Sequence, residues 1–175
     1  MSLGRALAIA AIKEGRFTTY FPSYGPEVRG GAAYCFVRIS DYPISSPLVD
    51  NPDVAILLNQ QSVDKFKTML SKKCLLVLNS DLIKDKSQVM AEKIIYLPLN
   101  KIALECGNIK CANVVALGAL IKVKPGILKQ STIVEIIKEI FCNNKELLEQ
   151  NIKALNKGLQ PQITQMVLPT DFTDE

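Results

Sequence analysis

Three short runs of consecutive apolar residues constrain the fold of this chain more than any other feature. They span residues 54–58, 74–78 and 94–97. Runs that are apolar at every position are typical of strands buried on both faces of a parallel sheet. The segment between the first two runs, residues 59–73, has apolar residues at helical spacing and is long enough for a crossover connection. The sequence therefore predicts a βαβ unit.

Helical periodicity dominates most of the remaining chain. A first helix is predicted at residues 3–13, with Gly15 as its stop, and a second at residues 101–105, with Asn100 as its cap and Gly107 as its stop. A third is predicted at residues 109–121. A fourth is predicted from a capping box formed by Thr132 and Glu135, and a last one ends near Gly158. The helix at 109–121 is nearly all apolar and is expected to be the most buried. Residues 80–93 are polar and charged, and we expect a loop or a short surface helix there.

These elements predict an α/β domain with three layers, helix–sheet–helix, and a mostly parallel or mixed sheet. The domain is expected to occupy residues 1–159 as a single unit. A C-terminal tail follows at residues 160–175, where acidic residues occur and basic ones do not. Its apolar side chains leave two alternatives open, a disordered end or an arm that docks on the body.

The loop at residues 21–31 is the first candidate functional site. Its sequence is Phe-Pro-Ser-Tyr-Gly-Pro-Glu-Val-Arg-Gly-Gly, in which prolines fix φ and glycines permit positive φ. Strand-like segments flank it at residues 16–21 and 32–39. A stiff loop between two strands, carrying one carboxylate and one guanidinium, fits an interface or ligand site, and a solvated surface turn is the alternative. The candidate residues are Ser23, Tyr24, Gly25, Pro26, Glu27, Arg29, Gly30, Gly31 and, from the next cluster, Asn59.

Polar clusters also follow two of the predicted parallel strands. They are Asn59-Gln60-Gln61 and Asn79-Ser80-Asp81. Ligands of open parallel sheets sit beyond the carboxyl ends of the strands, so both clusters are candidate ligand or interface positions. The alternative is that Asn59 and Asn79 only cap or turn the chain.

Composition excludes several kinds of chemistry. The chain of 175 residues contains no His, which removes His-dependent triads and His metal ligands together. Its five Cys form no Cys-x-x-Cys pair and are expected to be reduced, buried thiols of a cytoplasmic protein, so no metal site is predicted. A net charge of +4 is too small and dispersed to predict nucleic-acid binding, and no apolar stretch is long enough for a membrane span. No leader peptide is recognised at the start.

A series of segments resembles the gamma subunit, or gamma domain, of the 2-oxoacid:ferredoxin oxidoreductases. The loop at residues 21–31 is similar to the hallmark segment of that family. Further segments match in register, namely Ser-Asp-Tyr-Pro-Ile-Ser-Ser-Pro at 40–47, Leu-Asn-Gln-Gln-Ser at 58–62, Asp-Lys-Phe at 64–66, Leu97-Pro98, Gly107-Asn108 and Ala-Asn-Val-Val-Ala-Leu-Gly at 112–118. Within the family, the sequence of these segments is most similar to the 2-oxoglutarate type.

The resemblance implies a non-catalytic gamma subunit of a multi-subunit enzyme. Such enzymes use thiamine diphosphate, Mg and iron–sulfur clusters to convert a 2-oxoacid and coenzyme A (CoA) to an acyl-CoA ester and CO₂. For the 2-oxoglutarate type, the 2-oxoacid is 2-oxoglutarate and the ester is succinyl-CoA. The electrons pass to ferredoxin or a similar acceptor. The implied partners are alpha, beta and ferredoxin-like delta subunits. This chain is expected to bind no cofactor itself, to contain no catalytic residue, to be inactive alone, and to contribute to assembly and CoA handling as a swivelling domain.

One departure from the family concerns the first residues. Members of the family begin with a strand and a glycine-rich loop before the first helix, whereas this sequence starts inside that helix, near Gly4. We therefore expect the first strand of the sheet to be missing, which puts a CoA phosphate contact by this chain in doubt.

Other functions remain as alternatives. The gamma subunit could serve pyruvate or a branched-chain or aryl 2-oxoacid. The chain could instead be a free-standing α/β module that binds a small anionic ligand. A third alternative is an independent enzyme that uses Glu27 as a general base.

Overall fold

The computed structural model describes residues 1–24, 33–85, 89, 91, 93–160 and 166–167. The six strands of this described part form two sheets, and their bounds are β1 (Phe17–Ser23), β2 (Tyr34–Ser40), β3 (Val54–Leu57), β4 (Leu75–Asn79), β5 (Lys93–Leu97) and β6 (Met166–Val167). The α-helices are α1 (Ser2–Lys13), α2 (Gln60–Phe66), α3 (Leu99–Glu105), α4 (Ala112–Val123), α5 (Gln130–Ile140) and α6 (Lys145–Gly158). Two short 3-10 helices follow α2 and precede α4, at Lys67–Met69 and Ile109–Cys111.

The main sheet has the strand order β3-β4-β5-β6. The first three strands are parallel, with Val54 opposite Leu75 and Leu75 opposite Lys93, and β6 is antiparallel to β5. The predicted parallel strands and the crossover through α2 are therefore confirmed, and the sheet is mixed because of β6. Each crossover returns the chain to the same end of the sheet, as parallel pairing requires.

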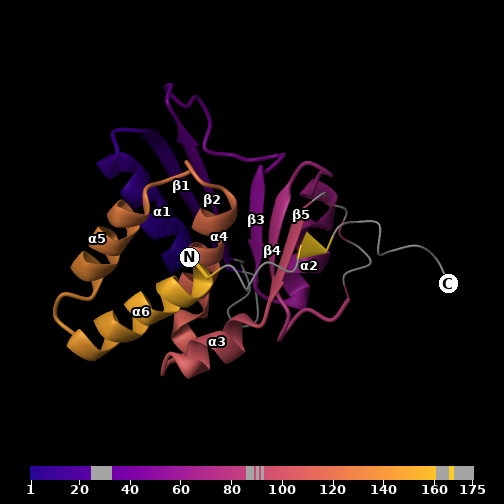
Figure 1. The fold of residues 1–175 in the computed structure, drawn as a ribbon. Coiled ribbons are helices and arrows are strands. Elements are labelled where there is room, and N and C mark those ends of the chain that lie inside the picture. The colour runs from indigo at the N-terminus through magenta and orange to yellow at the C-terminus, as the bar shows by residue number, and fades with distance from the viewer. Residues whose placement is uncertain (25–32, 86–88, 90, 92, 161–165, 168–175) are drawn as a thin grey trace.

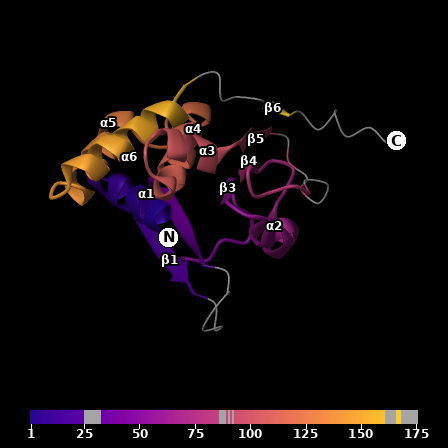
Figure 2. The same ribbon diagram turned by 90° about the horizontal axis from the view of Figure 1, so that it is seen from below.

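The side chains of the parallel strands alternate between two hydrophobic cores. Leu75, Val77 and Ile95 face a core shared with α1, α4, α5 and α6. Leu76 and Leu78 face a smaller core that includes Val63 of α2. Helices thus cover both faces of the sheet, as Figures 1 and 2 show, which confirms the predicted three-layer α/β architecture.

The strands β1 and β2 form a separate antiparallel hairpin, paired from Phe17 with Ser40 to Ser23 with Tyr34. Its inner face packs on α1 at Gly4. A Cβ atom at Gly4 would lie 2.3 Å from Cys35 Sγ and 3.2 Å from Val37 Cγ2. Only glycine therefore allows the helix and the hairpin to approach this closely.

Helices α4 and α6 also cross at a pair of glycines. A Cβ at Gly118 would lie 2.4 Å from the carbonyl oxygen of Leu155, and one at Gly158 would lie 2.2 Å from that of Val115. Helix α4 is buried over most of its length, as its apolar sequence predicts. Gly158 therefore has a packing role beyond its predicted role as a helix stop.

Three local predictions are wrong. Pro98, not Asn100, is the N-cap of α3, and Asn100 lies within the helix. Helix α5 begins at Gln130, so the proposed capping box falls inside it, and Glu135 instead accepts a hydrogen bond from Lys13 at 2.9 Å. The segment after β4 is not confined to the surface, because Ile83 and Val89 are buried in the smaller core. Tertiary contacts outweigh a local signal in all three cases, a capping pattern in the first two and the polar composition of the segment in the third.

Candidate functional site

The described end of the predicted loop stands on the hairpin. Ser23 closes β1 opposite Tyr34, and the following Tyr24 is 74% exposed. The two strands that flank the loop pair with each other, which confirms that the loop joins two strands. The predicted start of the loop is wrong, because β1 extends to Ser23 and residues 21–23 therefore belong to the strand. Six of the predicted site residues lie outside the described residues, and these are Gly25, Pro26, Glu27, Arg29, Gly30 and Gly31.

Asn79 is a buried and well-connected polar residue at the carboxyl edge of the main sheet. Its side chain is buried, with the residue 1% exposed. The amide nitrogen donates to the carbonyl oxygen of Leu58 at 3.1 Å and to Asn100 Oδ1 at 3.2 Å. The amide oxygen accepts from the backbone N–H groups of Leu99 at 3.1 Å and Asp81 at 3.3 Å. One side chain thus joins the ends of β3, β4 and β5.

Asn59 has a capping role at the same edge. Its Oδ1 accepts from the backbone N–H of Ser62 at 2.9 Å and from the Ser62 hydroxyl at 2.7 Å. This is the ordinary N-cap arrangement of a helix, here α2. The predicted alternative, that Asn59 and Asn79 cap or turn the chain, is the one that these contacts support.

Two further polar side chains of the edge, Gln60 and Asp81, also bond to the backbone of neighbouring loops. Gln60 Oε1 accepts from the N–H groups of Lys84 and Asp85, each at 3.1 Å. Asp81 Oδ2 accepts from the N–H of Lys101, in the first turn of α3, at 2.9 Å. The sequence placed the two clusters at one edge but did not identify Asn100 and Lys101 as their partners, because nothing local distinguishes these residues from solvated ones.

Burial makes three of the cysteine thiols weaker acids than a free thiol. Desolvation raises the pKa of Cys74 to about 11, and it also raises the pKa values of Cys106 and Cys111. All three residues are buried, as predicted, but the prediction is wrong for Cys142, which is exposed, and Cys35 is only partly buried. A cysteine binds a metal ion as the thiolate, which a raised pKa disfavours. In the part of the chain that the structure describes, no three His, Cys, Asp or Glu residues are grouped so that they could hold a metal ion.

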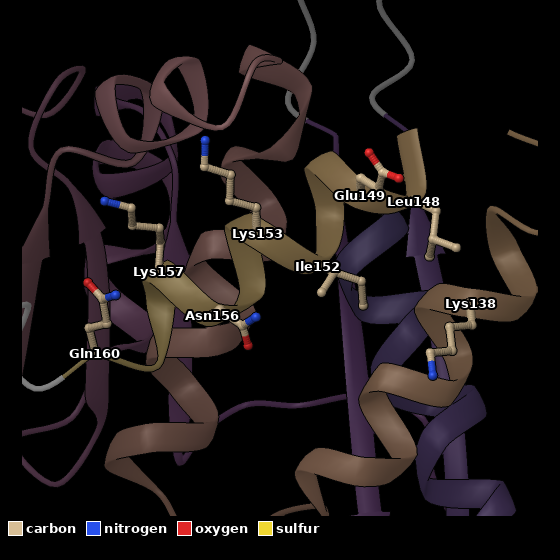
Figure 3. A pocket seen from close by; sticks show the side chains of 8 residues that line it. All are labelled: Lys138, Leu148, Glu149, Ile152, Lys153, Asn156, Lys157 and Gln160. Atoms are coloured by element: carbon tan, nitrogen blue, oxygen red, sulfur yellow. The ribbon is translucent and has the colours of Figure 1, made fainter. Parts of the chain in front are cut away.

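A groove of about 500 Å³ lies on the opposite side of the molecule from α2, along α6 and beside α5 (Figure 3). Leu148 and Ile152 supply apolar surface, and Lys138, Lys153 and Lys157 supply cations. Two of these lysines interact with Glu105 at the end of α3. Lys153 donates to its carbonyl oxygen at 3.0 Å, and Lys157 lies 3.8 Å from its carboxylate. Such contacts stabilise a helix C-terminus, so these two lysines have a structural role.

Among the described residues, no helix has the length and apolar character needed to cross a bilayer. Most of the side-chain hydrogen bonds of Asn59, Gln60, Asn79 and Asp81 at the sheet edge are made with the protein's own backbone. These contacts hold the loops at the carboxyl edge of the sheet in place.

Residues 1–161 match the family model described as pyruvate ferredoxin/flavodoxin oxidoreductase. The chain is 36% identical over 162 residues to 2-oxoglutarate synthase subunit KorC of Methanocaldococcus jannaschii, covering 90% of this chain and 82% of that protein. It is 34% identical over 160 residues to ketoisovalerate oxidoreductase subunit VorA of Methanothermobacter thermautotrophicus, covering 91% of this chain. This chain spans only about a third, 33%, of that VorA.

Solved structures share the fold. The gamma subunit of a keto/oxoacid ferredoxin oxidoreductase from Geobacter sulfurreducens superposes with a TM-score of 0.76 at 26% identity, over 89% of this chain and 85% of that one. A 2-oxoglutarate:ferredoxin oxidoreductase from Magnetococcus marinus superposes with a TM-score of 0.77 at 25% identity, over 91% of this chain but only 28% of that one. The chain therefore belongs to the pyruvate ferredoxin/flavodoxin oxidoreductase family, in which it corresponds to the gamma subunit of the 2-oxoacid:ferredoxin oxidoreductases.

Proposed function

We propose that this chain is the non-catalytic gamma subunit of a thiamine diphosphate-dependent 2-oxoglutarate:ferredoxin oxidoreductase, which forms succinyl-CoA and CO₂ from 2-oxoglutarate and CoA. The observation that carries the proposal is the match to KorC, which extends over 82% of that subunit at 36% identity. The chain thus resembles a whole subunit of a 2-oxoglutarate enzyme. Ketoisovalerate or pyruvate is the alternative substrate, supported by the 34% identity to VorA.

The role that we propose is assembly of the complex. The polar side chains at the carboxyl edge bond to the chain's own loops, as Asn79 and Asn59 do. A group held in this way fixes loop geometry and has little capacity left for substrate. The gamma subunit of Thermococcus kodakarensis is named as common to pyruvate and ketoisovalerate oxidoreductases. By analogy, we propose that companion subunits determine the choice of 2-oxoacid.

We also propose that the cofactors reside on the companion alpha, beta and ferredoxin-like delta subunits, in the cytoplasm. Three of the five cysteines here are buried thiols whose pKa values burial raises, so they are poor candidates for iron–sulfur ligands. Thiamine diphosphate, when bound to the companion subunits, supplies carbanion stabilisation for the decarboxylation. We further propose that Glu27 and Arg29, in the loop at residues 21–31, meet partner subunits or a ligand near the active site of the complex.

The test is purification of a tagged chain from its native host. We expect it to copurify with a thiamine-dependent partner, and the eluate to reduce ferredoxin in the presence of CoA and 2-oxoglutarate. The kcat/KM for 2-oxoglutarate should exceed those for pyruvate and 2-oxoisovalerate. The chain expressed alone serves as the control and should show no turnover.

Two outcomes would contradict the proposal in different ways. Recovery of the chain without any partner, and without 2-oxoacid oxidation, would reject the subunit role. Higher kcat/KM with pyruvate or 2-oxoisovalerate would retain the subunit role and reject the assignment of 2-oxoglutarate. Calorimetry on the isolated chain with CoA and nucleotides tests the alternative of a free-standing binding module. That alternative requires tight binding in the absence of any partner.

A further inference from the structure

The outer face of the β1–β2 hairpin carries a group of aromatic side chains. Tyr20, Cys35 and Val37 point inward, because they surround Gly4 of α1. Side chains alternate along a strand, and directly paired residues share a face. Phe17 and Phe21 of β1 therefore lie on the outer face, together with Phe36, which pairs with Phe21, and Tyr34, which pairs with Ser23. We call these four residues the aromatic face.

Two of these aromatic residues are unusually exposed for their size. Phe17 is 48% exposed and Phe21 is 41% exposed. Neither of the two described hydrophobic cores includes any of the four residues. Large apolar side chains that gather on one face mark an interaction site more often than scattered ones do.

The layer of helices on this side of the molecule ends at the edge of the hairpin. Phe66, the last residue of α2, contacts Tyr34 edge to face with ring centroids 4.9 Å apart. Figure 2 shows α2 beneath the main sheet, while β1 has α1 on its other side and, in the described part of the chain, no helix beneath it. The main sheet thus has three layers and the hairpin only two. A further element placed beside α2 would complete the third layer.

Two cations border the aromatic face, and the nearby carboxylate of Asp41, next to Ser40, is paired with Arg16 at 2.9 Å. Arg38 shares the outer face, since it pairs with Thr19, and it is exposed. Its guanidinium donates to the carbonyl oxygens of Ser46 at 3.0 Å and Leu48 at 3.3 Å, which holds it in place. Lys65 Nζ lies 4.4 Å from the ring centre of Tyr34. A partner with carboxylates around an apolar centre would complement this surface.

The size of the aromatic face fits the centre of an interface. Seven-residue strands extend about 24 Å. Stable interfaces bury about 800 Å² on each partner, which is more than two strands provide. Three other exposed residues would extend the contact area. Tyr24 and Tyr42 lie just beyond the ends of β1 and β2, and the carbonyl oxygen of Leu48 accepts a hydrogen bond from Arg38.

We propose that the aromatic face binds the oxidoreductase subunit that corresponds to the remainder of the longer relatives, through an apolar surface bordered by carboxylates. This inference rests on the proposed function. The VorA relative and the Magnetococcus marinus enzyme carry the matching module as 33% and 28% of one longer chain. The module is therefore joined to a much larger body in those proteins. A second copy of this chain is a poorer fit, because it would bring a second set of the same cations to the interface.

The test compares complexes purified from the native host through a tag on this chain. The variant Phe17→Thr/Phe21→Thr removes the exposed aromatic area while it keeps residues that favour strands. The control is Ile12→Gln/Leu104→Gln, which removes apolar side chains that are 61% and 60% exposed on helices α1 and α3. We expect the first variant to weaken binding of the companion subunit at least tenfold, and the control to change it less than twofold.

A second measurement remains informative if the variant fails to fold. Hydroxyl-radical oxidation of the wild-type complex should protect Phe17, Phe21 and Tyr34 relative to the isolated chain. Ile12 and Leu104 should be oxidised to the same extent in both. Mass spectrometry identifies the companion subunit, and thiamine-dependent 2-oxoacid oxidation confirms its nature.

The possible outcomes separate this inference from the proposed function. If the wild-type complex forms and the aromatic face stays reactive, or the folded variant binds normally, the inference is rejected and the proposed function stands. If no 2-oxoacid-oxidising partner is recovered, both are rejected. If light scattering shows that the isolated chain is a dimer that the Phe17→Thr/Phe21→Thr variant disrupts, the face serves self-association and the assigned partner is wrong.

Discussion

At the scale of single residues, Asn79 shows how a polar side chain can be structural in a position where ligands often bind. It lies beyond the carboxyl end of β4, is almost fully buried, and makes four hydrogen bonds to three neighbouring segments. A buried amide whose hydrogen bonds are all formed stabilises the fold, whereas leaving its partners buried without hydrogen bonds costs free energy. Asn79 therefore fixes the relative positions of β3, β5 and α3.

The first prediction concerns Asn79 and uses Asn59 for comparison. Asn79→Ala leaves the carbonyl of Leu58 and the N–H of Leu99 without these partners, and we expect the free energy of unfolding to fall by about 2–4 kcal/mol. Asn59→Ala removes only a helix cap and should cost about 1 kcal/mol. Urea unfolding measures both values. Equal decreases in the free energy of unfolding of the two variants would show that the hydrogen bonds of Asn79 contribute no more than an ordinary helix cap.

The second prediction concerns pH and the thiol of Cys74. Burial raises its pKa from 9.0 to about 11 in the folded chain. The associated stability is fully present below pH 9, since the thiol is then protonated in both states. Between pH 9 and pH 11 only the unfolded chain releases the proton, so the free energy of unfolding should fall by up to about 2–3 kcal/mol.

The variant Cys74→Val isolates this effect from the titration of lysines. Its free energy of unfolding should fall less steeply over the same pH interval, as measured by urea unfolding at successive pH values. Cys142, which is exposed, provides a check on accessibility, because it should react with a thiol reagent in the folded chain whereas Cys74 should not. Identical pH profiles for the variant and the wild type would contradict the assigned role of Cys74.

At the scale of secondary-structure elements, glycines set how closely helices approach their neighbours. Gly118 and Gly158 face each other where α4 crosses α6, and Gly4 lies where α1 contacts the hairpin. At each position a Cβ would fall within 2.4 Å of another heavy atom. Two of those atoms belong to backbone carbonyls, which cannot move aside as a side chain can.

The third prediction is that Gly158→Ala destabilises the protein although alanine favours helices. The preference for alanine contributes about 1 kcal/mol, whereas overpacking costs typically 1–3 kcal/mol and more where backbone atoms collide. We expect a net loss of about 1–3 kcal/mol in thermal or urea unfolding. Asn156→Ala, at an exposed position of the same helix, is the control and should be neutral or slightly stabilising. A Gly158→Ala protein as stable as the wild type would mean that α4 and α6 do not pack this closely.

At the scale of the whole molecule, the central strands couple the two hydrophobic cores. Successive residues of β4 alternate between them, with Leu75 and Val77 in one and Leu76 and Leu78 in the other. Neither core can be lost while the strand remains in place. The hairpin joins the larger core through its inner face, since Val37 and Ile39 pack against that core.

The fourth prediction is that both cores unfold in one transition. Circular dichroism follows mainly the helices on one side of the sheet, and tyrosine fluorescence includes Tyr34 and Tyr96 on the side of α2. The two signals should have the same urea midpoint. Leu76→Ala in the smaller core should lower both midpoints together, with a cost of about 2–5 kcal/mol. Separate midpoints would show that the two sides of the sheet are independent.

The sequence by itself determined the type of most elements and how the central strands run, although it did not predict β6. The continuous apolar runs at β3, β4 and β5 require cover on both faces, and that requirement implies parallel strands with helices on each side. The same reasoning placed the polar clusters of Asn59 and Asn79 at one edge of the sheet. The loop at residues 21–31 was predicted from proline and glycine chemistry, and the pairing of β1 with β2 at its ends agrees with that prediction.

Only the tertiary structure decided what the individual side chains do. Hydrogen-bond partners of Asn79 lie about 20 positions away along the chain, and the neighbour of Gly158 is in another helix. The aromatic face likewise depends on which side of the hairpin α1 covers, because alternation alone does not say which face is buried. Local signals fix element type through backbone preference and periodicity, whereas packing distances and exposed faces arise when distant segments meet.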